Sequence, residues 1–406
     1  MSDRYPGGLI RKTPPTITPP VDGEGGSAPG IWTLEQVAYY TKEGTWPKPI
    51  LPKELFAWGP NNVGALGSGN VVYTSSPIQI GALGDWSVIA EGNYSSYAVR
   101  SNGTLWAWGD DSSGALGQGV QGVPQSSPTQ IGSLTNWANV WGGQEQAFAV
   151  KTDGTMYSWG KETDGGLAQN NLVGSYWAPQ QVGSLTNWEK GSSSFGYHTH
   201  FIKTDGTLWG VGTNDYGLVG DNTTIARSSP VQIGSDTWLD VTENLIAVAI
   251  KSNGTLWAWG QAVYGLGNGT TVYASSPVQI GALTTWSNVG GNGRTTYAIK
   301  NDGTLWAWGY DGFGLLGVGT RSISMSSPVQ VGAETYWSQA TGGDNISFAR
   351  TTAGTLFSWG NNGGGALGQN TPIALDRSSP VQIGTDTNWN QIATGLGEWR
   401  MAKKIG

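Results

Sequence analysis

Short stretches in which apolar and polar residues alternate recur along most of this chain, separated by runs of glycine, serine and asparagine. Four kinds follow one another in a fixed order: a segment that starts at a single Trp (WSVIAEG, WSNVGGN), then YAVR or YAIK, then TLWAWG, then SPVQIG. Alternation with a period of two is typical of β-strands with one buried face. We therefore predict four short strands in each unit and an all-β fold.

Three sequence markers give the number of units. The first is the Trp-Gly pair that ends the TLWAWG segment, and its copies lie 48 to 52 residues apart. The second is S-S-P-x-Q-[IV]-G, with the variant WAPQQVG, and the third is the single Trp shortly after it. Each marker occurs seven times if Val211-Gly212 is counted in the one place that lacks Trp-Gly. The Trp-Gly pairs begin at Trp58, Trp108, Trp159, Trp259, Trp308 and Trp359.

Seven such units predict a β-propeller. A four-stranded sheet with a wide apolar face cannot bury that face alone, whereas a radial arrangement lets each sheet cover its neighbour. Asn-Gly or Asp-Gly joins the second strand to the third in five units, as at Asn102-Gly103. This dipeptide favours a two-residue type I′ hairpin, in which both central residues have positive φ.

The two ends of the repeat region complement each other. The last segment, RMAKKIG, has the pattern of a second strand, and no third strand follows it. Residues 54–59 have the pattern of a third strand, and no second strand precedes them. We predict that these segments pair and close the ring, so that residues 54–406 form a seven-bladed propeller of four-stranded blades.

Composition and charge then exclude several classes of protein. The chain of 406 residues has 65 Gly and 22 Trp, no Cys, 12% charged residues and a net charge of −7. Without Cys there are no disulfides, no catalytic thiol and no thiolate metal site. An acidic chain is poorly suited to phosphate backbones, so we expect no nucleic-acid partner. The longest apolar run, Leu245 to Ile250, is too short for membrane insertion.

The motifs YAIKxDGTLWAWG, GxLGxG and SSPVQIG, recurring about every 50 residues over 54–406, resemble the regulator of chromosome condensation repeat. The resemblance implies a seven-bladed propeller. The best-known activity of that family is nucleotide exchange on a small GTPase through an inserted β-hairpin wedge, and the uniform unit length leaves no room for such an insertion. Other members are docking surfaces, including a secreted inhibitor of β-lactamase. Kelch propellers share the period, but the WG-x-N-x-x-G-x-L-G run fits less well there.

Residues 1–53 differ from the repeats. They hold 9 of the 19 Pro, which predicts an extended arm, followed by one short helix over about 33–43 with a T-x-x-Q capping box at its start. So short a helix is unstable alone and must dock on its own propeller or on a partner. The segment APGIWTLEQVAYYTKEGTWP resembles stretches of tailed-bacteriophage structural proteins. We expect this arm to anchor the chain through Trp32, Leu34, Val37, Tyr40 and Trp46.

Residues that could carry chemistry are few. His198 and His200 alternate on a predicted strand and face the same way, as two metal ligands would, but no third ligand has matching spacing. His200 also takes the place held by Tyr97 in another unit, which favours packing. There is no Gly-x-Ser-x-Gly motif, and the glycine-rich runs precede no helix. We therefore expect no enzymatic activity, no cofactor and no metal.

In a propeller, the loops that join strands one to two and three to four share a face, and these loops differ most among the seven units. The third unit departs furthest, because Tyr176 and Trp177 replace the usual Ser-Ser. Aromatic side chains on loops are frequent anchors for protein or sugar partners. The candidate partner-binding residues on this face are Tyr176, Trp177, Phe195, Tyr197, His198, Trp141, Tyr216 and Arg294, with packing against a neighbouring blade as the alternative.

Two hypotheses of function follow. In the first, the chain is a bacteriophage virion protein, a head or tail decoration or fibre assembled in the host cytoplasm. Its arm would bind other virion proteins, and the variable loops would attach to a host surface protein or glycan. In the second, it is a cytoplasmic interaction module, such as a scaffold or inhibitor. An enzyme at the mouth of the central channel is the third reading.

Overall fold

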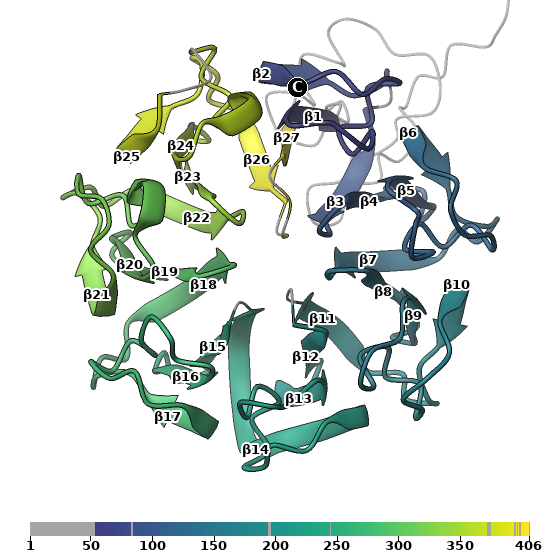
Figure 1. The fold of residues 1–406 in the computed structure, drawn as a ribbon, viewed down its shortest axis with the longest axis horizontal. Coiled ribbons are helices and arrows are strands. Elements are labelled where there is room, and N and C mark those ends of the chain that lie inside the picture. Colours follow the sequence, from purple (N-terminus) through teal and green to yellow (C-terminus); the bar gives the residue numbers. More distant parts are fainter. Residues whose placement is uncertain are drawn as a thin grey trace, which may run out of the picture. The chain divides into compact units, whose positions relative to one another are not determined.

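The chain divides into two units, residues 1–52 and residues 53–406. The computed structural model describes residues 53–405, except 83, 194–195, 244, 372–374, 394, 396 and 398. The predicted arm helix and the five anchoring residues of the arm lie outside the described residues. The second unit is a ring of four-stranded blades arranged around a central axis (Figure 1), which confirms the predicted propeller. Five blades are separate sheets, and two share one long strand and form a seven-stranded sheet. The described residues contain no helix long and apolar enough to cross a membrane.

Each blade runs from an innermost first strand to an outermost fourth strand. The first strands are β3 (Trp86–Glu91), β7 (Trp137–Gly142), β11 (Trp188–Ser193), β18 (Trp286–Asn292), β22 (Trp337–Gly342) and β26 (Trp389–Ile392). The second strands are β4 (Ser95–Arg100), β8 (Gln146–Lys151), β12 (His198–Lys203), β15 (Ile246–Lys251), β19 (Thr295–Lys300), β23 (Ile346–Thr351) and β27 (Arg400–Ile405).

The third strands are β1 (Lys53–Gly59), β5 (Leu105–Gly109), β9 (Met156–Gly160), β13 (Thr207–Gly212), β16 (Leu256–Gly260), β20 (Leu305–Gly309) and β24 (Leu356–Gly360). The fourth strands are β2 (Thr74–Gln79), β6 (Gln125–Gln130), β10 (Tyr176–Gln181), β17 (Ala274–Gln279), β21 (Met325–Gln330) and β25 (Arg377–Gln382). The long β14 (Arg227–Glu243) is the fourth strand of one blade and the first of the next. Two 3₁₀ turns, η1 (Gly312–Gly314) and η2 (Gly363–Gly365), lie in loops.

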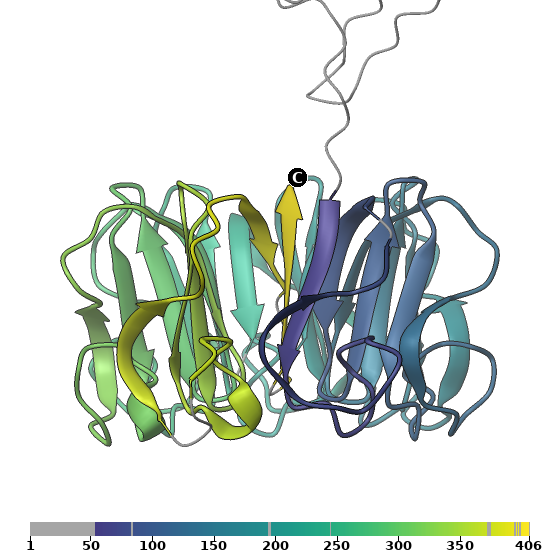
Figure 2. The ribbon, with the colours of Figure 1, turned by 90° about the horizontal axis from the view of Figure 1, so that it is seen from above.

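The ring closes through a blade made from both ends of the repeat region, as predicted. Its strand order is β2-β1-β27-β26, so β1 lies between two partners. β1 and β27 pair antiparallel from Lys53 opposite Ile405 to Trp58 opposite Arg400. Figure 2 shows these two strands side by side. The closing blade therefore has the same hydrogen-bonded core as the other six.

The hairpins between the second and third strands correct the predicted turn type. Gly103 N–H donates to the Arg100 carbonyl (2.9 Å), and Arg100 N–H donates to the Thr104 carbonyl (3.0 Å). Gly103 has φ +76°, whereas Asn102 is not among the residues with positive φ. This is a three-residue loop closed by a left-handed glycine rather than a type I′ turn. The reason is local: the Asn102 side chain accepts hydrogen bonds from the N–H and hydroxyl of Thr104.

The same bonds account for the repeated [ND]-G-T-L-W sequence. Thr104 Oγ1 donates to Asn102 Oδ1 (2.7 Å) and accepts from Trp106 Nε1 (2.8 Å). Equivalent chains of hydrogen bonds occur in three other blades, at Asp205-Thr207-Trp209, Asn253-Thr255-Trp257 and Asp302-Thr304-Trp306. Each Trp at the start of a third strand is therefore fixed by the turn that precedes it.

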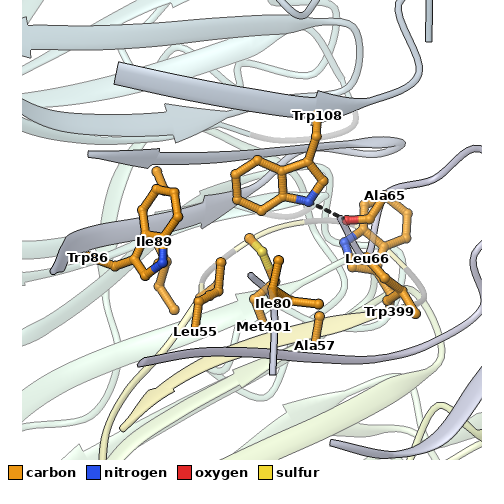
Figure 3. Packing of buried hydrophobic residues seen from close by; sticks show 12 residues of the cluster. Leu55, Ala57, Ala65, Leu66, Ile80, Trp86, Ile89, Trp108, Trp399 and Met401 are labelled. Carbon is orange, nitrogen blue, oxygen red and sulfur yellow. Dashed lines mark hydrogen bonds between the residues drawn. The ribbon is translucent and has the colours of Figure 1, made fainter. Parts of the chain in front are cut away.

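The core consists of seven apolar clusters, each shared by two neighbouring blades. Figure 3 shows the cluster between the closing blade and the next one, in which Trp108 packs among Leu55, Ile80 and Met401. The indole Nε1 of Trp108 donates to the carbonyl of Ala65 in the preceding blade (2.9 Å). Four more Trp-Gly tryptophans make the same bond, namely Trp58, Trp159, Trp259 and Trp359.

A second aromatic arrangement repeats near the hairpins. In every blade, the ring that opens the first strand meets an aromatic ring of the third strand edge-on, as Trp286 meets Trp306 with centroids 6.2 Å apart. In five blades a lysine at the end of the second strand lies over both rings, and Lys300 Nζ is 3.7 Å from the Trp306 centroid. The aliphatic part of the lysine thus covers apolar rings while its charge contacts their π-faces.

Deletion of residues 54–59 should lower the melting temperature sharply. The deletion removes the central strand of the closing blade, exposes one edge each of β2 and β27, and opens the cluster around Trp108. Thermal unfolding followed by circular dichroism tests this. The half-buried Glu54→Ala is the matched control and should melt like the wild type, whereas an unchanged melt of the deletion would show that closure does not stabilise the ring.

Trp108→Phe should cost more stability than Trp308→Phe. Both indoles are fully buried, but Trp308 Nε1 has no hydrogen-bond partner among the described residues. The loop facing Trp308, Gly260 to Gly267, is one residue shorter than its equivalents. Loss of the bond to Ala65 should make the difference about 1 kcal/mol. Urea unfolding of the two variants measures it, and equal losses would contradict this role of the bond.

Candidate interaction face

The two faces of the ring are built differently. One face, here called the hairpin face, carries the short turns between second and third strands and the connections from one blade to the next. The other, here called the variable face, carries the loops from first to second and from third to fourth strands, which lie at the bottom of Figure 2. Lys53, the first described residue, lies on the hairpin face beside Gly84.

The long loops of the variable face are held by a repeated polar side chain, which is buried in five blades and half-buried at Glu162. Asn61 Oδ1 accepts from the N–H of Leu66, five residues later (3.0 Å). The equivalent acceptors in five other blades are Asp111, Glu162, Asn214, Asp311 and Asn362. Asn61, Asn214 and Asn362 also donate to the returning limb of their loops, at Asn70, Ile225 and Thr371. These bonds join the two limbs, so the loops are preorganised and the residues between the bonded positions are free to vary.

The negative charge of the molecule is concentrated on the variable face. Among its described residues that lie outside buried ion pairs, acidic side chains outnumber basic ones about two to one. The acidic residues are Asp110, Asp111, Glu145, Glu162, Asp164, Asp215, Asp221, Asp311, Asp344 and Asp376, and the basic ones are Lys161, Arg227, Arg294, Arg321 and Arg377. Clustered charge of one sign attracts partners of the other sign over about a Debye length.

Several of the predicted partner-binding residues are accessible on this face. Trp177 is 44% exposed and lies against Gly114, and Tyr176 accepts a hydrogen bond from Asn171 (2.9 Å). Tyr216 is 40% exposed and its ring contacts Tyr273. Two others lie at the ends of loops that join first and second strands. Tyr197 bonds Glu145, and the guanidinium of Arg294 lies 5.6 Å from the Tyr310 ring centroid.

Two of the predicted residues are buried instead, which corrects the expectation that they face a partner. Trp141 stacks on Phe148 inside the cluster between two blades, because its strand β7 turns that side chain away from the loop. His198 is 1% exposed. Phe195 lies outside the described residues.

His198 and His200 point the same way, as the alternation predicted, and both meet Glu243 of the next blade. His198 Nε2 lies 2.9 Å from Glu243 Oε2, and His200 Nδ1 contacts the other carboxylate oxygen. His200 Nε2 bonds the Val219 carbonyl (3.0 Å). The described residues contain no group of three ligands arranged for a metal ion. His200 takes the slot of Tyr97, as expected, since it lies opposite Gly210 as Tyr97 lies opposite Ala107.

The carboxylate equivalent to Glu243 in another blade belongs to a second buried ion pair. This carboxylate is Glu91, and its partner is Arg400 of the preceding, closing blade. Arg400 lies opposite Trp58 and therefore takes the place of Thr199, one residue after His198. The side chains of Glu91 and Arg400 are fully buried. Burial raises the pKa of Glu91 to about 7, more than Arg400 lowers it. Burial acts in the same direction on Glu243, but the two histidines outweigh it and hold that pKa below its usual value.

The central channel contains a cavity of about 190 Å³ lined by the innermost strands. Among the described residues, the innermost strands of neighbouring blades do not pair with each other, and polar side chains connect them. Gln339 bonds both the N–H and the carbonyl of Ile392 in the following blade, and Asp240 accepts from Asn288 and the N–H of Val289. These groups are engaged in holding the ring together.

Two depressions adjoin on the variable face near the channel mouth. One, of about 350 Å³, is lined by Asn61, Asp344 and Trp399, and the other, of about 250 Å³, by Asp110, Ser113 and Glu145. Both are also lined by Val63, Tyr94 and Gln144, and we call the combined depression the Tyr94 groove.

The sequence pattern alone does not reveal these groove residues, because they lie on ordinary loops of four blades that meet only in the ring. One available signal was Tyr94, an aromatic residue in a first-to-second loop.

Comparison with known proteins finds similarity in part of the chain. The family model for the regulator of chromosome condensation (RCC1) repeat matches residues 54–99, 102–150, 302–350 and 353–397. These four segments of the propeller are similar to RCC1 repeats. The ultraviolet-B receptor UVR8 of Arabidopsis thaliana is 27% identical over 344 residues, covering 80% of this chain and 77% of UVR8. The probable E3 ubiquitin-protein ligase HERC6 of Homo sapiens is 33% identical over 184 residues, 43% of this chain but 18% of HERC6.

Solved structures agree on the fold. Human WBSCR16 superposes with a TM-score of 0.77 at 17% identity, covering 87% of this chain and 99% of that one. Prp20p of Saccharomyces cerevisiae gives 0.75 at 15% identity, with 88% and 92% covered. None of these relatives and solved structures supports the bacteriophage structural role, and the segment on which that expectation rests lies outside the described residues.

The two buried carboxyls should respond to pH in opposite ways. The pKa of Glu91 is about 7 in the folded chain and about 4.5 when exposed, so the folded state binds its proton more strongly and stability falls as pH rises between these values. Glu243 has a lowered pKa, so its contribution is present near neutral pH and is lost as pH falls below about 4.5.

Melting temperatures of Glu91→Gln and Glu243→Gln between pH 4 and pH 8 measure this. Glu91→Gln should flatten the decline between pH 5 and pH 8. Glu243→Gln should lose about 3 kcal/mol at pH 7, because it leaves two imidazoles without their carboxylate, and less at pH 4. Parallel curves for the wild type and both variants would refute the assignment, and the exposed Asp215→Asn is the control.

Proposed function

We propose that this RCC1-repeat propeller is a protein-interaction module whose partner docks on the variable face. The observation that carries the proposal is the contrast between the two faces. The hairpin face repeats the same turn chemistry from blade to blade. The variable face combines preorganised loops of different sequence, an excess of carboxylates and the Tyr94 groove. Variable side chains on a rigid frame are what a specific docking surface requires.

Related propellers support this reading. The yeast RCC1 protein Prp20 has been crystallised with Kap60 bound, and Prp20p has been described with binding to Gsp1p and histones. HERC6 and HERC2 are named as ubiquitin ligases, yet this chain spans about a fifth of HERC6 and a twentieth of HERC2. A ligase activity therefore does not transfer with the propeller.

A non-enzymatic role is part of the proposal and stays a prediction. The cytoplasmic location, the anchoring role of residues 1–53 and the virion setting that this arm suggested also stay predictions. Mass spectrometry of purified particles tests the virion setting directly.

Two matched sets of substitutions test which face binds. The first replaces Tyr94, Trp177 and Tyr216 of the variable face by Ala, and the second replaces Leu134, Leu185 and Leu283 of the hairpin face by Ala. All six side chains are 40% to 54% exposed, so neither set should change the melting temperature much.

The wild type and the two substituted proteins, each tagged and full-length, are used to capture partners, and the captured proteins are quantified by mass spectrometry. Proteins retained by the wild type should be retained by the hairpin-face set and lost with the variable-face set. Loss with the hairpin-face set alone would assign docking to the opposite face and overturn the proposal.

A further inference from the structure

We propose that the Tyr94 groove binds a basic segment of a protein partner, with an Arg or Lys side chain lying on the Tyr94 ring between the carboxylates of Asp110 and Asp344. This inference rests on the proposed function and names the chemistry of the partner. It is carried by the shape of the groove, its charge and the exposure of one aromatic ring.

The shape of the groove suits an extended chain with long side chains. Its two depressions are separate pockets that share the walls Val63, Tyr94 and Gln144, so Tyr94 stands between them. Their volumes, about 250 and 350 Å³, are at the lower end of the range for small-ligand sites. Apolar wall atoms from Val63 and Ala115 suit the aliphatic stem of an Arg or Lys.

The charge of the groove is negative at both ends. Asp344 lies in one depression, and Asp110 lies with Glu145 in the other. Glu145 is bound by Lys161 at 2.7 Å, whereas neither Asp110 nor Asp344 has a cation within salt-bridge distance among the described residues. Their hydrogen-bond donors are the neutral Ser112 and Asn345. Two carboxylates therefore remain available to a guanidinium or ammonium group.

The third observation is the exposed aromatic ring of Tyr94. It is 54% exposed, and its ring makes no aromatic or cation contact with the rest of the described chain. Elsewhere on this face, Tyr216 meets Tyr273, and Tyr310 is covered by Tyr264 and Arg294. The Tyr94 backbone is fixed, because its carbonyl accepts from the N–H of Asp110 (2.9 Å). Tyr94 and Asp110 line the same depression, and this bond joins their backbones before any partner arrives.

This arrangement favours Arg over Lys. A guanidinium can stack on the ring and still donate in its own plane to a carboxylate, whereas an ammonium is a point charge with a larger hydration cost. The face as a whole adds long-range attraction, because its carboxylates outnumber its cations.

The experiment measures fluorescence anisotropy of labelled Gly/Ser decapeptides titrated with full-length chain. The peptides carry two Arg, two Lys or two citrullines, and citrulline keeps the shape of Arg without its charge. Saturable binding is expected in the order Arg, Lys, citrulline, weakening by about tenfold or more from 50 to 500 mM NaCl. Equal binding of the citrulline peptide, or binding that does not depend on salt, would overturn the proposal in favour of a neutral ligand such as a glycan.

Variants then assign the site. The double variant D110N/D344N should raise the Kd for the Arg peptide about tenfold, and Tyr94→Leu about threefold. Asp215→Asn and Tyr273→Leu remove the same groups from the same face outside the groove and should leave the Kd unchanged. Melting temperatures of all four confirm folding, since the substituted side chains are not buried.

The outcomes separate this inference from the proposed function. If the variable-face set loses its partners but the groove variants bind the Arg peptide as the wild type does, the groove assignment is wrong and the interaction face stands. If the groove variants weaken peptide binding but the partners are lost only with the hairpin-face set, the proposed function is wrong. Equal weakening by the control variants would make the peptide a probe of general charge only and overturn the groove as the site.

Discussion

Each blade of this protein exposes two faces of a four-stranded sheet, and neither face has any means of burial except the neighbouring blade. The Trp-Gly tryptophans meet this requirement, because their rings fill the space between sheets and most of their indole N–H groups bond a carbonyl of the preceding blade. No blade is complete without the next, so the ring must close. The pairing of β1 with β27 satisfies that condition with an ordinary antiparallel ladder.

Because closure fixes the frame, sequence variation is confined to positions that the frame does not use. The loops of the variable face are tied at both limbs by buried polar side chains such as Asn61, and the residues between can differ without disturbing the sheets. The uncovered ring of Tyr94 and the carboxylates that do not hold a loop, such as Asp110 and Asp344, lie among those free positions. The buried ion pairs of Glu91 and Glu243 belong to the frame, since they join consecutive blades at the channel where no backbone ladder does.

The strands, the repeat units and the closure of the ring could be predicted from local sequence patterns. The period-two alternation, the three markers and the unmatched strands at the two ends depend on nearby residues, and all of them are confirmed in the sheet pairings. The turn type was wrong because the Asn-Gly pair was judged by φ preference alone. Hydrogen bonds from Thr104 to the Asn102 side chain favour a longer loop, and only their geometry reveals that competition. The burial of Trp141 and His198 was likewise hidden, since which way a side chain at a strand end points depends on the blade beside it.

The sequence by itself determined the number of blades, their strands and the way in which the ring closes. These follow from hydrophobic period and repeat spacing, which are properties of segments shorter than one unit. The tertiary structure decided which side chains share a surface. Asp110, Tyr94 and Asp344 lie on loops of three chain segments up to about 250 residues apart, and only the circular arrangement brings them to one groove. A site assembled from different blades leaves no local pattern in any one of them, because its geometry belongs to the ring.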